Sequence, residues 1–182
     1  EEVHVVCLFD RAEQAWAWQE RVYAALPPLW NDPQAFGVQL VVDAEGNVRG
    51  TNERLLLVSV ALTIEQVVAE VQRLGGLSIA AHVDRPSFSL LANLGLVPKG
   101  LPLAALELTP RTAPHEARAR FPQVAGWPLI VSGDAHRLEE MGTWTTLTMA
   151  EPCVAEVALA LAGTDGRSVE VSAHRCPDRT GR

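Results

Sequence analysis

Apolar residues recur along the chain with two different periods. Short runs of aliphatic and β-branched residues predict strands, and segments with apolar residues three or four positions apart predict helices. The predicted strands are residues 3–9, 38–42, 48–50, 77–81, 104–108, 129–132, 145–149 and 167–171. The predicted helices are residues 10–26, 63–74, 114–121 and 154–161. Residues 54–61 fit a strand or a loop equally well. The alternation of strands and helices favours an α/β fold with a largely parallel sheet, open or barrel-like.

Capping and turn residues support several of these boundaries. Thr63 with Gln66 has the spacing of a capping box, and glycines at 75 and 76 end the helix that it begins. Asp10 with Glu13 has the same spacing before the first predicted helix. The turn-forming residues 43–47 separate two apolar runs, which predicts a β-hairpin outside the main sheet.

The two ends of the chain differ from the middle. Val3 to Phe9 already has the pattern of the middle of a strand, so we expect a segment to precede Glu1 in the native protein. Residues 174–182 are polar and predict a flexible C-terminal tail. We therefore expect one domain over residues 1–173, which lacks its first strands.

Composition narrows the class of protein. The chain has 182 residues, of which 48% are hydrophobic and 20% charged, enough for one globular domain with a core. A net charge of −7 argues against a broad nucleic-acid surface, although a local metal cluster could still attract phosphates. Three widely spaced cysteines predict no disulfide framework and favour a reducing, cytoplasmic compartment. No apolar run approaches the roughly 18 residues of a membrane span, so no membrane partner is expected.

Polar residues that can bind metals lie in or at the ends of apolar strands. These residues are His4, His82 and, after the strand at 129–132, Asp134 and His136. Neutral imidazole is the commonest nitrogen ligand of zinc, and a carboxylate brings negative charge to a cation. Each residue also has an ordinary interpretation, in which Asp134 caps a helix and each histidine forms hydrogen bonds in the core or a loop. Strands that bring several imidazoles to one end of a sheet favour a metal site.

Two arginines next to these residues are candidate phosphate contacts. Arg85 follows His82 and Arg137 follows His136, and a guanidinium can bind a phosphate through two hydrogen bonds. The alternative is a surface ion pair within each loop, such as Arg85 with Asp84. His115 and His174 have the pattern of solvent-exposed residues.

Nucleophilic and nucleotide-binding motifs are absent. Ser132 precedes a glycine but lacks the Gly-x-Ser-x-Gly turn, and Cys7 lies within a strand. No Gly-x-x-x-x-Gly-Lys-Ser/Thr phosphate loop occurs in the sequence. The sequence therefore supports nucleophilic catalysis less well than it supports a metal site.

Three segments, EEVHVV around His4, AAHVDRP around His82 and SGDAHR around Asp134, occur in an order that resembles the PHP (polymerase and histidinol phosphatase) domain family. The chain resembles the C-terminal two-thirds of that domain. The resemblance implies a distorted (β/α)7 TIM-like barrel, here incomplete at its N-terminus, with two or three divalent metal ions (Zn, Mn or Fe). It further implies that His4 and His82 share one metal, that Asp134 binds a second and that His136 binds a third.

The resemblance also implies a function. Most members of the family are phosphoesterases, so we expect hydrolysis of a phosphate monoester or nucleotide by a metal-activated water, with a small phosphorylated molecule as the substrate. The family's opening His-x-His motif and its metal-bridging glutamate do not occur in this sequence. An inactive metal-binding scaffold or interaction domain is therefore the alternative. Hydrolysis of a non-phosphate bond, as in barrel amidohydrolases, is a third possibility.

Overall fold

The computed structural model describes residues 1–172, and its chain forms two compact units. The first unit comprises residues 1–18 and the chain from residue 63 onward, and the second comprises residues 19–62. Helix α1 (Ala12–Ala24) begins in the first unit and ends in the second. The predicted tail at 174–182 lies outside the described residues, and the predicted domain boundary at 173 stays a prediction.

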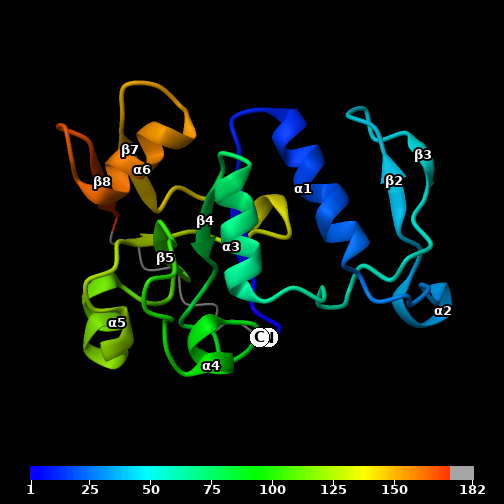
Figure 1. The fold of residues 1–182 in the computed structure, drawn as a ribbon, viewed down its shortest axis with the longest axis horizontal. Helices are drawn as coiled ribbons and strands as arrows, with labels where there is room; N and C mark the ends of the chain where they lie inside the picture. Colours follow the sequence, from blue (N-terminus) through cyan, green and yellow to red (C-terminus); the bar gives the residue numbers. More distant parts are fainter. Residues whose placement is uncertain (173–182) are drawn as a thin grey trace. The chain divides into compact units, whose positions relative to one another are not determined.

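The first unit is built around a four-stranded sheet in the order β1-β4-β5-β6. Figure 1 labels its two central strands, β4 and β5. Its strands are β1 (Val5–Leu8), β4 (Leu77–Ala80), β5 (Ala105–Leu108) and β6 (Leu129–Val131). A separate two-stranded antiparallel sheet pairs β7 (Thr145–Thr148) with β8 (Ser168–Val171). The helices of this unit are α3 (Ile64–Arg73), α4 (Leu90–Leu94), α5 (Pro114–Arg120) and α6 (Val154–Ala162), with 3-10 turns at Pro122–Val124 and Leu138–Glu140.

The direction of β1 departs from the expected parallel sheet. β4, β5 and β6 are mutually parallel, as the strand–helix alternation predicts, but β1 pairs with β4 antiparallel, with Val5 opposite Ala80. The predicted distorted (β/α)7 barrel is therefore wrong for the described residues, which contain no closed barrel. The physical reason is that β7 and β8 hydrogen-bond to each other rather than to the main sheet, so β1 and β6, the outer strands of that sheet, are not joined.

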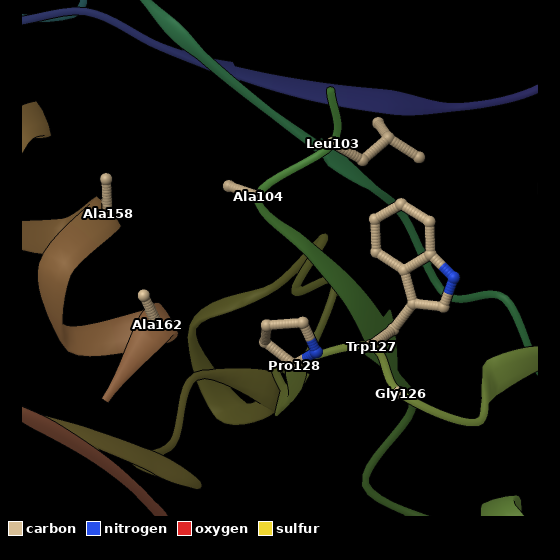
Figure 2. Close-up of a pocket in the computed structure, with 7 residues that line it drawn as sticks. All are labelled: Leu103, Ala104, Gly126, Trp127, Pro128, Ala158 and Ala162. Atoms are coloured by element: carbon tan, nitrogen blue, oxygen red, sulfur yellow. The ribbon is translucent and has the colours of Figure 1, made fainter. Parts of the chain in front are cut away.

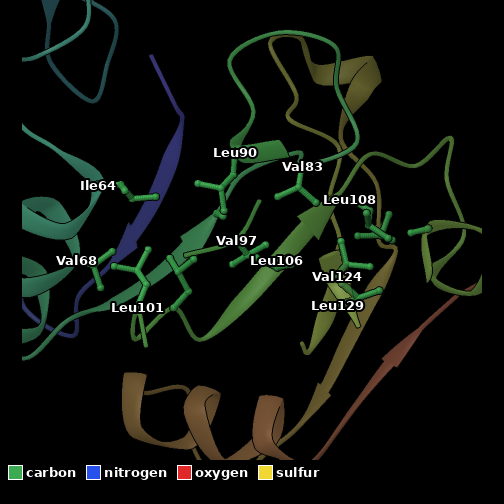
Figure 3. Close-up of a cluster of buried hydrophobic side chains, with 14 residues drawn as sticks. Ile64, Val68, Val83, Leu90, Val97, Leu101, Leu106, Leu108, Val124 and Leu129 are labelled. Atoms are coloured by element: carbon green, nitrogen blue, oxygen red, sulfur yellow. The ribbon is translucent and has the colours of Figure 1, made fainter. Parts of the chain in front are cut away.

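Apolar side chains cover both faces of the sheet. Every residue of β4 and β5 is buried, which is typical of strands that helices cover on both sides. Figure 3 shows the larger cluster, in which Ile64 and Val68 of α3 pack with Leu106 and Leu108 of β5. On the opposite face, Leu161 of α6 packs in a second cluster with residues of β4 and β5. Truncating one of these leucines to alanine would cost about 2–5 kcal/mol.

Local signals in the sequence account for several helix boundaries. Thr63 and Gln66 form the predicted capping box at the start of α3, with hydrogen bonds in both directions. Asp10 does not form its predicted box. Its carboxylate instead accepts a hydrogen bond from the backbone N–H of Val154, the first residue of α6. A distant helix therefore receives the cap that sequence spacing assigned to α1.

The second unit contains the predicted hairpin. It comprises β2 (Leu40–Val42), β3 (Val48–Thr51) and the short helix α2 (Pro33–Phe36). The side chain of Asp43 holds the turn by accepting hydrogen bonds from the backbone of Glu45 and Asn47. Residues 54–61, for which a strand or a loop was expected, form a loop with one isolated bridge between Trp30 and Arg54.

Candidate metal and phosphate site

One edge of the main sheet collects the predicted site residues. The parallel strands β4, β5 and β6 end at this edge, and His82, Thr109 and Asp134 follow them in the chain. Because β1 runs antiparallel, its beginning rather than its end lies there, with the carbonyl of His4 accepting a hydrogen bond from the N–H of Ala81. The reversed strand therefore brings His4 to the same edge as His82.

His4 and His82 are in direct contact. The Nδ1 atom of His4 lies 3.1 Å from the Nε2 atom of His82, and the two rings meet edge to face with centroids 5.1 Å apart. Two nitrogens bound to one ion at 2.0–2.1 Å, with tetrahedral or octahedral angles, lie roughly 2.9–3.4 Å apart. The observed separation therefore fits two ligands of a single metal ion, and it also fits a hydrogen bond in which one ring donates to the other.

The His82 ring is buried and incompletely satisfied. His82 is 1% exposed, and the Nδ1 atom of its ring has no hydrogen-bond partner within the described residues. Burial lowers the pKa of His82 below its usual value, and the positive charge of Arg85 and the neighbouring His4 act in the same direction. A neutral imidazole, which is the form that binds metals, is therefore favoured.

The loop after His82 is tied to the end of β5 by Asp84. Its carboxylate accepts hydrogen bonds from the backbone N–H of Thr109 at 2.9 Å, from the hydroxyl of Thr109 at 2.6 Å and from the hydroxyl of Thr112 at 2.7 Å. The N–H of Arg85 donates to the carbonyl of His82, which closes a turn. Asp84 therefore holds the segment that carries both His82 and Arg85.

Arg85 does not form the loop pair with Asp84 that was one alternative. Its Nη1 atom lies 2.7 Å from the Oδ2 atom of Asp134, across the edge of the sheet. Asp134 likewise does not cap a helix, and its backbone has a φ of +45°. The predicted phosphate contact and a predicted metal ligand are thus paired with each other.

His136 and Arg137 belong to the loop that follows β6. Both are exposed, and the Nδ1 atom of His136 contacts the carbonyl oxygen of Asp134 while its backbone N–H donates to Glu140. Among residues 1–172, no three His, Cys, Asp or Glu side chains are arranged to hold a metal ion. Within the described residues, the separation of His4 and His82 fits two ligands of one ion, and the two or three ions that the resemblance implies stay a prediction. The assignment of Asp134 and His136 to further metals stays a prediction.

Sequence reasoning missed Glu107. This residue is 5% exposed in the buried strand β5, and its carboxyl group contacts the Ser132 side chain and the backbone N–H of His82. Burial raises the pKa of Glu107, and these two hydrogen bonds oppose the increase. A lone carboxylate inside an otherwise apolar strand, ALEL, was the signal that could have identified it.

Backbone strain is concentrated at this edge. Five non-glycine residues of the described chain have a positive φ, and three of them, His82, Phe88 and Asp134, belong to this site. Such conformations cost about 1–3 kcal/mol each and cluster at functional sites. Phe88, which the sequence did not single out, stacks on the His4 ring with centroids 5.3 Å apart.

The pocket in Figure 2 lies at the other end of the sheet. It has a volume of about 420 Å³ and is lined by residues that precede β5 and β6, together with Ala158 and Ala162 of α6. None of its lining residues is ionisable. Cys7 also offers no nucleophile, because burial raises its pKa to about 11. Neither feature supplies the chemistry of hydrolysis.

None of the helices within residues 1–172 is long and apolar enough to cross a membrane.

Comparisons with known proteins identify structural neighbours. No protein-family model and no curated protein matches the sequence. The fold is similar to the lesion-specific endonuclease PfuEndoQ from Pyrococcus furiosus, with a TM-score of 0.62 and 19% identity over 92% of this chain. It is also similar to Endonuclease Q in complex with a 27-mer duplex substrate that has an abasic lesion at the active site, with a TM-score of 0.60 and 18% identity over 92% of this chain.

The chain spans 38% of the length of each neighbour. At these identities the likeness shows the fold alone, and that fold is compatible with a PHP-like domain. The expectation of a small phosphorylated substrate or nucleotide is wrong on this comparison, because the similar structure holds a DNA duplex rather than a small molecule.

Proposed function

We propose that this chain carries a metal-dependent phosphoesterase site that acts on phosphodiester bonds of nucleic acid. The observation that carries the proposal is the contact between His4 and His82, whose nitrogens have the separation of two ligands of one ion. The likeness to endonucleases supports hydrolysis of a phosphodiester and a divalent metal. When bound, such a metal supplies a water with a lowered pKa and neutralises charge on phosphoryl oxygens.

The residues of the chain would divide the remaining work. His4 and His82 would hold the metal as neutral imidazoles, and Asp134 would bring negative charge to the same edge. Arg85 would bind a phosphate oxygen once Asp134 engages a cation, and the exposed Arg137 would be a second phosphate contact. Because the whole chain has a net charge of −7, such local cations are needed to attract a polyanion.

A second candidate function is a metal-binding scaffold without turnover. This function is favoured because the described residues bring two potential metal-ligating side chains together, but not three. A single pair of imidazoles can bind a cation without assembling a catalytic centre.

One experiment separates these functions. The purified chain would be analysed for bound metal, loaded with Zn²⁺, Mn²⁺ or Mg²⁺, and incubated with a duplex containing one abasic site, an undamaged duplex and bis(4-nitrophenyl) phosphate. Metal-dependent cleavage that disappears in His82→Gln supports the phosphoesterase. Bound metal without cleavage of any substrate supports the scaffold, and full activity in chelator contradicts both.

A further inference from the structure

The side chain of Phe88 covers His4 and leaves much of its own ring in solvent. The two rings are nearly parallel, at an interplanar angle of 10°, and Phe88 is 50% exposed. An aromatic ring that packs on one face and is exposed elsewhere offers a flat apolar surface beside the two histidines.

Several contacts hold Phe88 in this position. The backbone N–H of His4 donates to the carbonyl of Phe88 at 3.1 Å. The next residue, Ser89, is fully buried, donates its hydroxyl to the carbonyl of Arg85 and caps α4 by accepting from Ala92. Leu90 is fully buried in the core directly after it. The exposed ring therefore projects from an anchored segment.

The backbone of Phe88 is strained. Its φ is +55°, a region that bulky side chains rarely adopt. The fold maintains this conformation although it leaves an aromatic ring half exposed, where burial would have been favourable. Trp16, another exposed aromatic of the first unit, lies within the regular helix α1 and has no such strain. The exposure of Phe88 is thus built into the loop, which is typical of a binding residue.

We infer that Phe88 is a stacking platform for an unpaired nucleobase next to the phosphodiester bound at this edge. The inference rests on the proposed function and adds to it a substrate class, nucleic acid with a base that is single-stranded or extruded from a duplex. Every base has a π-face, so stacking on one aromatic ring tolerates any sequence. Arg85, whose carbonyl is fixed by Ser89, carries the guanidinium for the adjoining phosphate on the same loop.

The test separates base stacking from phosphate binding. Two single-stranded oligonucleotides of equal length would be compared. One would be abasic at every position, and the other would carry a single 2-aminopurine and be abasic elsewhere. Their affinities for the full metal-loaded chain would be measured by competition. The wild-type chain should prefer the base-containing oligonucleotide by about 5- to 100-fold, with quenched 2-aminopurine fluorescence.

Three variants complete the design. Phe88→Leu keeps an apolar contact with His4 but lacks the ring, so the ratio of the two affinities should fall to about 1. Phe88→Trp should keep both the ratio and the quenching. Trp16→Leu is the matched control, and its ratio should equal that of the wild type.

Three results would overturn the inference, and they differ in whether they also refute the proposed function. A chain that cleaves bis(4-nitrophenyl) phosphate and binds both oligonucleotides equally, or a Phe88→Leu variant that keeps the preference, refutes the platform alone. A chain that binds neither oligonucleotide and cleaves no diester refutes the proposed function together with it.

Discussion

Arg85 and Asp134 form an ion pair, with 2.7 Å between Nη1 and Oδ2, that joins the loop after β4 to the loop after β6. Their side chains are 39% and 30% exposed, so the pair contributes only about 0.2–1 kcal/mol to stability. The importance of the pair is chemical. The carboxylate of Asp134, which we propose engages a metal ion, holds the guanidinium of Arg85, which we propose binds phosphate. Occupancy of Asp134 by a cation and availability of Arg85 are therefore coupled.

Replacing Asp134 should release Arg85 without any metal. Asp134→Asn is expected to strengthen binding of a single-stranded oligonucleotide in chelator by about 3- to 10-fold at low salt. The substitution frees the guanidinium of Arg85 and removes a negative charge. Fluorescence anisotropy with a labelled oligonucleotide measures the change. Arg85→Gln in the same background should return the affinity to the wild-type value.

The matched control for this variant is Glu139→Gln, which makes the same change in net charge at an exposed position. An equal gain of affinity in Glu139→Gln would show that net charge alone, and not the release of Arg85, explains the result.

Replacing His82 should abolish binding of the metal ion that we propose for His4 and His82. His82→Gln is expected to weaken binding of Zn²⁺ by at least about 100-fold, because altering even the supporting residues of a metal site typically costs 10- to 100-fold. Competition with a chromogenic chelator measures the affinity. His115→Asn, in the exposed first turn of α5, is the control and should bind as the wild type does. Unchanged affinity in His82→Gln would remove the paired histidines from the site.

Asp84 should be a structural anchor of the loop that carries His82. Asp84→Ala leaves three donors from Thr109 and Thr112 without their acceptor and is expected to lower the free energy of unfolding by about 1–3 kcal/mol. Thr112→Val removes one of these bonds and should cost about 0.5–1.5 kcal/mol. Urea denaturation measures both. Ser87→Ala, at an exposed position of the same loop, should have little effect, and a loss as large as that of Asp84→Ala would contradict the anchor.

Glu107 should make stability depend on pH. Burial raises its pKa in the folded chain, so its contribution is fully present below the unfolded pKa, near 4.5, and is lost as the pH rises through the folded value. Because Gln stays uncharged, the stability of Glu107→Gln relative to the wild type should increase as the pH rises from about 4 to 8.

Urea midpoints at several pH values test the behaviour of Glu107. Glu170→Gln, an exposed position on β8, provides a control whose difference from the wild type should vary little over the same range. A difference for Glu107→Gln that is constant with pH would show that its carboxyl group titrates alike in the folded and unfolded chains.

The sequence by itself determined where most secondary structure lies. The capping box of Thr63 and Gln66, the hairpin around Asp43 and the three buried strands that end before His82, Thr109 and Asp134 follow from local patterns. Local backbone preferences and hydrophobic periodicity act over a few residues, so the sequence shows them directly. The candidate histidines could be identified for the same reason, since polar residues interrupt otherwise apolar strands.

Only the tertiary structure decided how these elements combine. The separate pairing of β7 with β8 leaves the main sheet open in place of the expected barrel, and the antiparallel direction of β1 brings His4 against His82. The partner of Arg85, the burial of Glu107 and the exposure of Phe88 likewise depend on segments distant in the chain. Strand direction and side-chain pairing are set by long-range hydrogen bonds and packing, which no local period of apolar residues encodes.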